Sequence, residues 1–169
     1  MVIPPRAEAF LSMIMWAEGT SRGGLDPYAV TYGYTHTIKD FSDHPAITGE
    51  WLGLRLPDHY CRAAGLKPGC RSTAAGAFQI NKPTWKDPQL RKLYTPKSFA
   101  PDEQRAFTWG AIIPACGARR LILEGHTAEA IGKCAGRWAS FSGSSAGQPT
   151  RQLQDLLDVY NSAYERAKA

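Results

Sequence analysis

The chain has 169 residues, of which 43% are hydrophobic and 21% are charged, so its composition suits one folded domain over residues 1–169 and excludes a disordered chain. The net charge of +5 favours an anionic partner, but the basic residues are scattered and form no run typical of nucleic-acid binding. No segment reaches the roughly 18 to 20 apolar residues that span a bilayer, so we expect no stable membrane insertion.

Residues 5–18 are predicted to form a helix. Two prolines precede or open it, which suits a first turn whose N–H groups have no partner within the helix. Gly19 follows the last periodic residue, where a left-handed cap is common. The apolar residues that recur at helical spacing are Ala7, Phe10, Leu11 and Ile14.

The next part of the chain is predicted to form a small antiparallel sheet. Residues 28–34 alternate aromatic and smaller side chains as a strand does, with Gly33 as a candidate bulge. Residues 40–49 are predicted to be a loop, and residues 58–64 a short helix. Residues 72–80 are expected to form another strand or a strand-to-helix turn.

The remainder of the chain is predicted to be a larger helical lobe. Pro101 followed by Asp102 is typical of a helix start, and residues 142–148 are predicted from their Gly and Ser content to be a loop. The predicted fold class is therefore α+β: an N-terminal helix, a small antiparallel sheet and a helical lobe. Helices are expected over residues 83–93, 101–116, 117–124, 127–138 and 149–166.

Glu18 is the candidate catalytic residue. It follows Leu11 and Ile14 by seven and four positions, which places its carboxyl on the apolar stripe of the predicted helix. Burial and the helix C-terminus both disfavour a negative charge, so we expect a raised pKa. A protonated carboxyl is the proton donor that cleavage of a glycosidic bond requires. The alternative is a glutamate at a frayed helix end that faces solvent.

Three stretches of the sequence resemble the signature motifs of lambda-type phage endolysins. Further similar positions follow in the same order, and the resemblance extends from about residue 7 to 165. Each motif is weak alone, but their order within one domain is specific. The three stretches are Trp16-Ala17-Glu18-Gly19-Thr20, Asp40-Phe41-Ser42-Asp43-His44-Pro45 and Ser72-Thr73-Ala74-Ala75-Gly76-Ala77-Phe78-Gln79-Ile80.

The resemblance implies a lysozyme-like fold and lytic transglycosylase activity on peptidoglycan glycan strands. Such enzymes cut the β-1,4 bond between N-acetylmuramic acid and N-acetylglucosamine without water and leave a 1,6-anhydro-muramoyl end. Glu18 matches the family's catalytic glutamate, which acts first as an acid and then as a base. A hydrolytic muramidase and a non-catalytic wall-binding module are the alternatives.

The resemblance and the residue chemistry together suggest a set of substrate-binding positions. Gln79 offers an amide suited to N-acetyl groups or to orienting Glu18. Ala75 and Ala77 depart from the residues common in relatives, and residues 47–71 form an enlarged segment expected to act as a lid or subsite. The predicted substrate-binding residues are Gly76, Phe78, Gln79, Tyr32, Trp138, Ser140 and Gln148, with Tyr34 a further groove candidate and core packing an equal alternative for Trp138.

A second catalytic carboxylate is not required by a transglycosylase, although a hydrolase normally uses one. Asp26, Asp40 and Asp43 are the candidates, and capping or loop hydrogen bonding is the more ordinary role for each. No cofactor is expected. His36 and His44 lack the ligand spacing of a metal site.

The four cysteines match no zinc motif. Cys61 and Cys70 flank a short loop that a disulfide would close, whereas Cys116 and Cys134 lie in predicted helices and suit buried free thiols.

The N-terminus does not resemble a signal peptide, because Arg6 and Glu8 interrupt it. Lambda-type endolysins lack one too, so the resemblance implies a protein made in the host bacterial cytoplasm that reaches the periplasm through a separate, holin-type permeabilising protein. We also expect a monomer.

Overall fold

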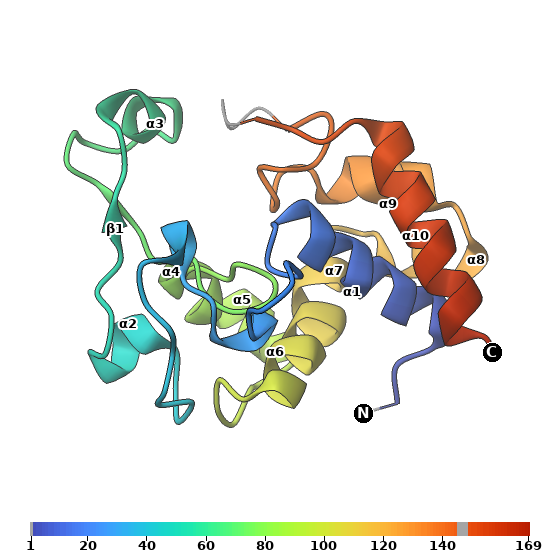
Figure 1. Ribbon diagram of the computed structural model, residues 1–169, viewed down its shortest axis with the longest axis horizontal. Coiled ribbons are helices and arrows are strands. Elements are labelled where there is room, and N and C mark those ends of the chain that lie inside the picture. The colour runs from blue at the N-terminus through green and yellow to red at the C-terminus, as the bar shows by residue number, and fades with distance from the viewer. Residues whose placement is uncertain (1, 145–148) are drawn as a thin grey trace.

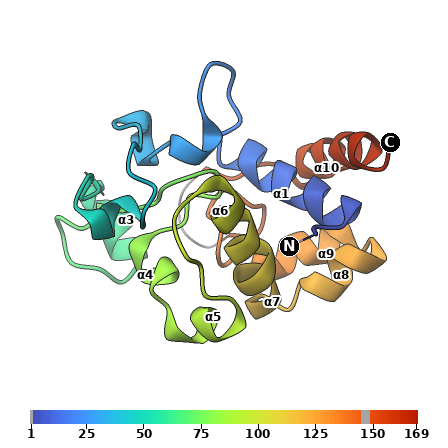
Figure 2. The same cartoon turned by 90° about the horizontal axis from the view of Figure 1, so that it is seen from below.

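The computed structural model describes residues 2–144 and 149–169, and Figures 1 and 2 show a helical lobe beside a smaller, extended one. In Figure 1 the extended lobe, with β1 and α3, lies on the left, and α8, α9 and α10 lie on the right. The described elements are α1 (Pro5–Ala17), the 3-10 turns η1 (Pro27–Ala29) and η2 (Tyr32–Tyr34), α2 (Pro45–Thr48), β1 (Leu54–Arg55), α3 (Asp58–Ala63), β2 (Arg71–Ser72), α4 (Lys82–Trp85), α5 (Pro88–Leu93), α6 (Pro101–Phe107), the π-helical η3 (Thr108–Ile112), α7 (Ile113–Ala115), α8 (Arg119–Glu124), α9 (Thr127–Cys134) and α10 (Leu153–Ala167).

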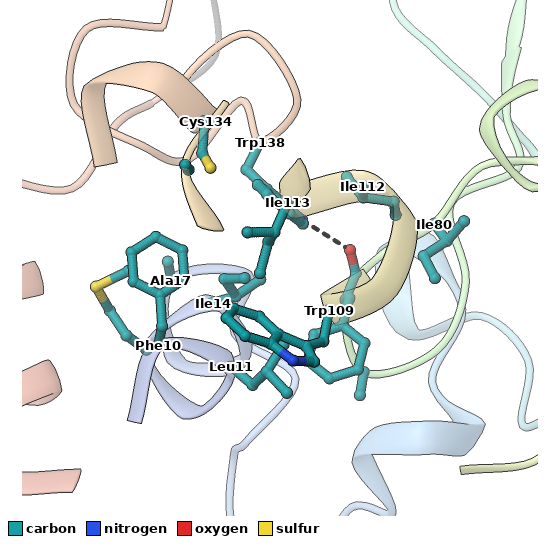
Figure 3. Packing of buried hydrophobic residues seen from close by; sticks show 14 of the residues in the cluster. Phe10, Leu11, Ile14, Ala17, Ile80, Trp109, Ile112, Ile113, Cys134 and Trp138 are labelled. Carbon is teal, nitrogen blue, oxygen red and sulfur yellow. Dashed lines mark hydrogen bonds between the residues drawn. The ribbon is translucent and has the colours of Figure 1, made fainter. Parts of the chain in front are cut away.

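Helix α1 forms the centre of the core, as its periodicity predicts. Phe10, Leu11 and Ile14 are fully buried, and α10 packs along the helix. The helix that begins at Pro101 continues through η3 into α7, and Trp109 of η3 and Ile113 of α7 pack near the α1 residues in Figure 3. The first helix is thus held from several sides, and its C-terminal end has a defined position.

The predicted strand over residues 28–34 is wrong. This stretch contains the two turns η1 and η2, joined to the rest of the sheet region only by single bridges. The Asp26 side chain accepts a hydrogen bond from the Tyr28 N–H at 3.0 Å and starts the first turn. Gly33 and Tyr34 both have positive φ, which an extended strand does not allow.

The sheet is smaller than predicted, although it is antiparallel. It consists of β1 and β2, with Leu54 opposite Ser72. After β2 the chain turns, and backbone hydrogen bonds between Ala75 and Ile80 close the turn. Of the two forms expected for residues 72–80, the turn is therefore the dominant one.

Several predicted helix boundaries differ from the structure for local reasons. Residues 83–93 are two helices, because the Asp87 side chain caps a new helix that begins at Pro88. The predicted loop over 40–49 contains α2, which follows a cap from the His44 side chain. The predicted helices over 127–138 and 149–166 are shorter at one end, whereas the short helix near 58–64 is confirmed.

The extended lobe is closed by a disulfide between Cys61 and Cys70, which confirms the pairing considered from their spacing. Cys116 and Cys134 are free, as expected. Cys134 is buried and Cys116 is half-buried.

Gly76 lies against the buried side chain of Gln104, which links three segments of the chain. The Gln104 Oε1 accepts from the Ala77 N–H at 2.9 Å, and its Nε2 donates to the carbonyls of Tyr28 and Phe99. Gly76 has φ 74°, and a Cβ there would lie 2.1 Å from Oε1 of Gln104. Glycine is therefore required by both conformation and space.

Gly76→Ala is expected to lower the free energy of unfolding by more than about 3 kcal/mol, because it adds a clash with a buried amide to the cost of a left-handed alanine. Gly65→Ala is the matched control, since Gly65 also has positive φ but a Cβ there would meet no other atom within 4 Å. It should cost about 1–2 kcal/mol. Urea denaturation measures both, and equal losses would contradict the steric role of Gln104.

Candidate active site

Glu18 caps the C-terminal end of α1, and the adjoining residues fix its position. The Glu18 N–H donates to the Ile14 carbonyl at 2.9 Å, so the helical path continues to this residue. The buried Thr20 hydroxyl makes hydrogen bonds to the carbonyls of Met15 at 3.1 Å and Ala77 at 2.7 Å. The end of α1 is thereby tied to the turn that contains Gln79.

A cleft of about 460 Å³ opens beside this helix end. Its volume lies within the range of about 300–1,000 Å³ that small-molecule and substrate sites usually have. Both lobes contribute, because Leu54 comes from β1 and Ser140 from the loop after α9. The lining residues are Ala17, Glu18, Thr20, Val30, Thr31, Tyr32, Gly33, Tyr34, Leu54, Gln79, Ser140 and Pro149.

The carboxyl of Glu18 is held largely out of water. Burial raises the pKa of Glu18 to about 7, while the hydrogen bond from Ser140 and the positive charge of Arg151 oppose that rise. The Ser140 hydroxyl donates to Oε1 of Glu18. The raised pKa expected from the apolar stripe is therefore present, and the group can hold or release a proton near neutral pH.

Four of the residues predicted for the site lie together in the cleft: Glu18, Tyr32, Gln79 and Ser140. Gln79 has φ 48°, and its Nε2 donates to the Gly76 carbonyl at 3.0 Å. Ser140 was expected to contact substrate, and the structure shows it bonded to Glu18 itself. The further candidate Tyr34 also lines the cleft.

Three predicted substrate-binding residues lie elsewhere. Phe78 and Trp138 are 1% and 3% exposed, and the Trp138 indole donates to the Phe78 carbonyl at 3.0 Å, so both side chains belong to the core. Figure 3 shows Trp138 among the buried hydrophobic residues. Gly76 packs against Gln104 and lies outside the cleft lining. The expectation that these three contact the glycan is therefore corrected. Gln148 lies outside the described residues.

Leu54 and Arg151 belong to the site but were not identified from the sequence. Leu54 lies within the enlarged segment 47–71, which was the only signal available for it. Arg151 reaches the end of α1 from 134 residues away, where its Nε donates to the Ala17 carbonyl at 3.4 Å. No local pattern marks such a contact.

A family profile described as Endolysin matches residues 8–166, which is almost the whole chain. The endolysin of Escherichia phage lambda is 30% identical over 156 residues, covering 92% of this chain and 89% of that protein.

The chain belongs to the endolysin family.

Two solved structures agree with this family and confirm the lysozyme-like fold. Bacteriophage lambda lysozyme complexed with a chitohexasaccharide superposes with a TM-score of 0.74 and 29% identity, covering 96% of each chain. A second structure, lysozyme from bacteriophage lambda, gives a TM-score of 0.69 and 26% identity over 99% of this chain and 96% of that one. The resemblance seen in the sequence motifs is thus confirmed at the level of family and fold.

The three candidate second carboxylates have structural roles. Asp26 and Asp40 accept backbone N–H groups two residues ahead, from Tyr28 and Ser42. Asp43 accepts the Trp85 indole at 2.7 Å. Among the described residues that line the cleft, Glu18 carries the only carboxyl group.

His36 and His44, whose spacing does not suit a metal site, form other contacts. His36 pairs with Glu50 at 2.9 Å. His44 is fully buried, its ring bonds to the Ile80 carbonyl, and burial lowers the pKa of His44 to about 4. Within residues 2–144 and 149–169 no group of three or more potential metal ligands is found.

Glu18→Gln is expected to remove a pH-dependent loss of stability. The pKa of Glu18 is about 7 in the folded protein against an ordinary 4.5, so the folded state binds this proton more tightly. Stability from this group is therefore present below pH 4.5 and is lost as pH rises through about 7. Relative to Glu18→Gln, the wild type should lose up to about 3 kcal/mol between about pH 4 and about pH 8.

Urea denaturation of both proteins across that pH range measures the difference, in which other titrating groups cancel. Glu129→Gln, at an exposed position of α9, is the control and should show no such divergence from the wild type. Parallel curves for wild type and Glu18→Gln would contradict the buried carboxyl.

Ser140→Ala is expected to raise the pKa of Glu18 further, because the hydroxyl stabilises the carboxylate form by donating to it. Difference infrared spectroscopy against Glu18→Gln isolates the titration of this one carboxyl. Ser142→Ala, two residues away in the same loop, is the control. An unchanged or lowered pKa in Ser140→Ala would exclude this role of the hydroxyl.

Proposed function

We propose that this endolysin-family chain cleaves bacterial peptidoglycan as a lytic transglycosylase with Glu18 as its catalytic residue. The cut is at the β-1,4 bond between N-acetylmuramic acid and N-acetylglucosamine. The observation that carries the proposal is a single buried carboxyl, held near the midpoint of its titration at neutral pH, on the wall of a cleft between two lobes. The similar lambda lysozyme, complexed with a chitohexasaccharide, supports a glycan as the ligand.

The chemistry follows from the two forms of this carboxyl. Protonated Glu18 gives its proton to the glycosidic oxygen as the bond from the muramoyl C1 to that oxygen breaks. The C6 hydroxyl of the same muramoyl residue then forms a bond to C1, and the carboxylate of Glu18 accepts the hydroxyl proton. The enzyme returns to its starting state, water is not consumed, and the product carries a 1,6-anhydro ring.

Neighbouring residues support both steps. Burial keeps the proton on Glu18 before transfer, whereas Ser140 and Arg151 stabilise the carboxylate that remains afterwards. A second carboxylate is not needed, because the attacking hydroxyl belongs to the substrate. Tyr32 and Gln79 are proposed to contact the sugars, Tyr32 through its ring face and Gln79 through its amide.

The place of action follows from the substrate. We infer that the protein is made in the host cytoplasm, reaches the wall in the periplasm through a separate permeabilising protein, and acts there as a monomer to lyse the cell. In the part of the chain that the structure describes, no helix has the length and apolar character to cross a membrane.

Mass spectrometry of digested peptidoglycan tests the chemistry. The expected products end in anhydro-muramoyl groups, each lighter by one water than a hydrolysis product, and digestion in ¹⁸O-labelled water should leave them unlabelled. Glu18→Gln should lower the rate by about 10²–10⁴-fold, whereas Glu129→Gln should retain it. Labelled reducing ends would instead identify a hydrolytic muramidase, and full activity of Glu18→Gln would refute the site.

A further inference from the structure

A second pocket lies beside the catalytic cleft, on the other side of the turn that follows α1. Its volume is about 280 Å³. Residues of this turn alternate between the two hollows, since Glu18 and Thr20 line the cleft whereas Gly19 and Ser21 line the second pocket. We call it the arginine pocket. It is lined by Trp16, Gly19, Ser21, Arg22 and Arg151.

Both arginines of this pocket are positioned by aromatic rings. The Arg151 guanidinium lies 4.9 Å from the centre of the Trp16 ring, and that of Arg22 lies 5.2 Å from the Tyr34 ring. Tyr34 is itself fixed by a 2.9 Å hydrogen bond from its hydroxyl to the Gly19 carbonyl, and it also lines the cleft. Stacking holds the plane of a guanidinium, and the N–H groups in that plane are then pre-oriented for an anion.

The charge and size of the arginine pocket define the ligand. Its described lining carries two positive charges and no acidic side chain. Arginine forks match the geometry of carboxylates, with which they form paired, charge-assisted hydrogen bonds. The volume is just below the usual range of small-molecule sites, about 300–1,000 Å³. It therefore suits a charged substituent of a chain in the neighbouring cleft better than a further sugar.

We propose that the arginine pocket binds a carboxylate carried by the muramoyl residue of the glycan strand, and so sets the register in which the strand meets Glu18. This inference rests on the proposed function. In the alternating strand only N-acetylmuramic acid bears a lactyl group, whose carboxyl is either free or joined to a peptide with carboxylates of its own. N-acetylglucosamine bears none. A carboxylate site beside Glu18 thus distinguishes the two kinds of β-1,4 bond.

Occupancy of the pocket is also coupled to catalysis through Arg151, whose Nε donates at 3.4 Å to the carbonyl of Ala17, the residue before Glu18. This cation lowers the pKa of Glu18, against the larger effect of burial. A carboxylate bound to Arg151 offsets part of its field, so Glu18 holds its proton more firmly when the strand is in register. The acid is then best prepared for transfer at the bond that should be cut.

Binding measurements in the Glu18→Gln background test this inference without turnover. Two pairs of ligands separate the two sources of the carboxylate. One pair is a peptide-free muramoyl glycan with its lactyl carboxylates free or converted to methylamides. The other is a peptide-bearing glycan with its peptide carboxylates free or converted in the same way. Isothermal titration calorimetry at low ionic strength gives the four affinities.

In at least one pair the free carboxylate should bind about tenfold more tightly than the amide, and the pair that shows this identifies the source. Adding Arg22→Gln and Arg151→Gln should abolish that preference while leaving affinity for the amides within about twofold. Arg119→Gln is the matched control, because Arg119 also stacks on an aromatic ring, that of Trp109 at 5.0 Å, yet lines neither hollow. It should keep the tenfold preference.

Two results would overturn the inference while leaving the proposed function intact. One is equal binding of carboxylate and amide in both pairs. The other is an equal loss for carboxylate and amide in the double variant, which would indicate a merely structural role of the arginines. Failure of all four glycans to bind would instead count against the proposed function itself.

Discussion

The end of α1 is where the core and the cleft meet, and the other features of the site depend on it. Phe10, Leu11 and Ile14 bury one face of this helix completely, and the same face carries the Glu18 carboxyl to the cleft wall. A helix packed on several sides cannot rotate without losing these contacts. The position of the carboxyl is therefore set by the packing of the hydrophobic core, with Thr20 tying the helix end to the turn that carries Gln79.

The protonation of Glu18 reflects a balance between burial and two distant partners. Burial alone would keep the carboxyl neutral, which serves proton donation but not the return step. Ser140 and Arg151 counter it through a hydrogen bond and a positive charge, and the resulting pKa of about 7 leaves both forms accessible. Because both partners come from the C-terminal part of the chain, the site is complete only when the loop after α9 and the residue Arg151, just before α10, are in place.

The turn that follows α1 serves two surfaces at once. Its residues alternate between the cleft and the arginine pocket. Tyr34 connects the two hollows, because it lines the cleft and its ring stacks with Arg22 of the arginine pocket. A short backbone segment thus joins the acid to a cationic site. Such proximity lets charge in one hollow act on the titrating group in the other, since the intervening protein screens less than water does.

The sequence by itself determined the first helix, the candidate acid at its end and the family. Helical periodicity depends only on neighbours within one or two turns of the helix. The ordered motifs match those of endolysins, in which Glu18 corresponds to the catalytic glutamate. The sequence did not determine the turns over residues 28–34. The alternating tyrosines there resemble a strand, but capping by Asp26 and the positive φ of Gly33 and Tyr34 produce turns instead. Only the tertiary structure assigned Phe78 and Trp138 to the core and brought Arg151 to the end of α1. These outcomes depend on contacts between residues 60 to 134 positions apart, and no local pattern of side chains encodes such contacts.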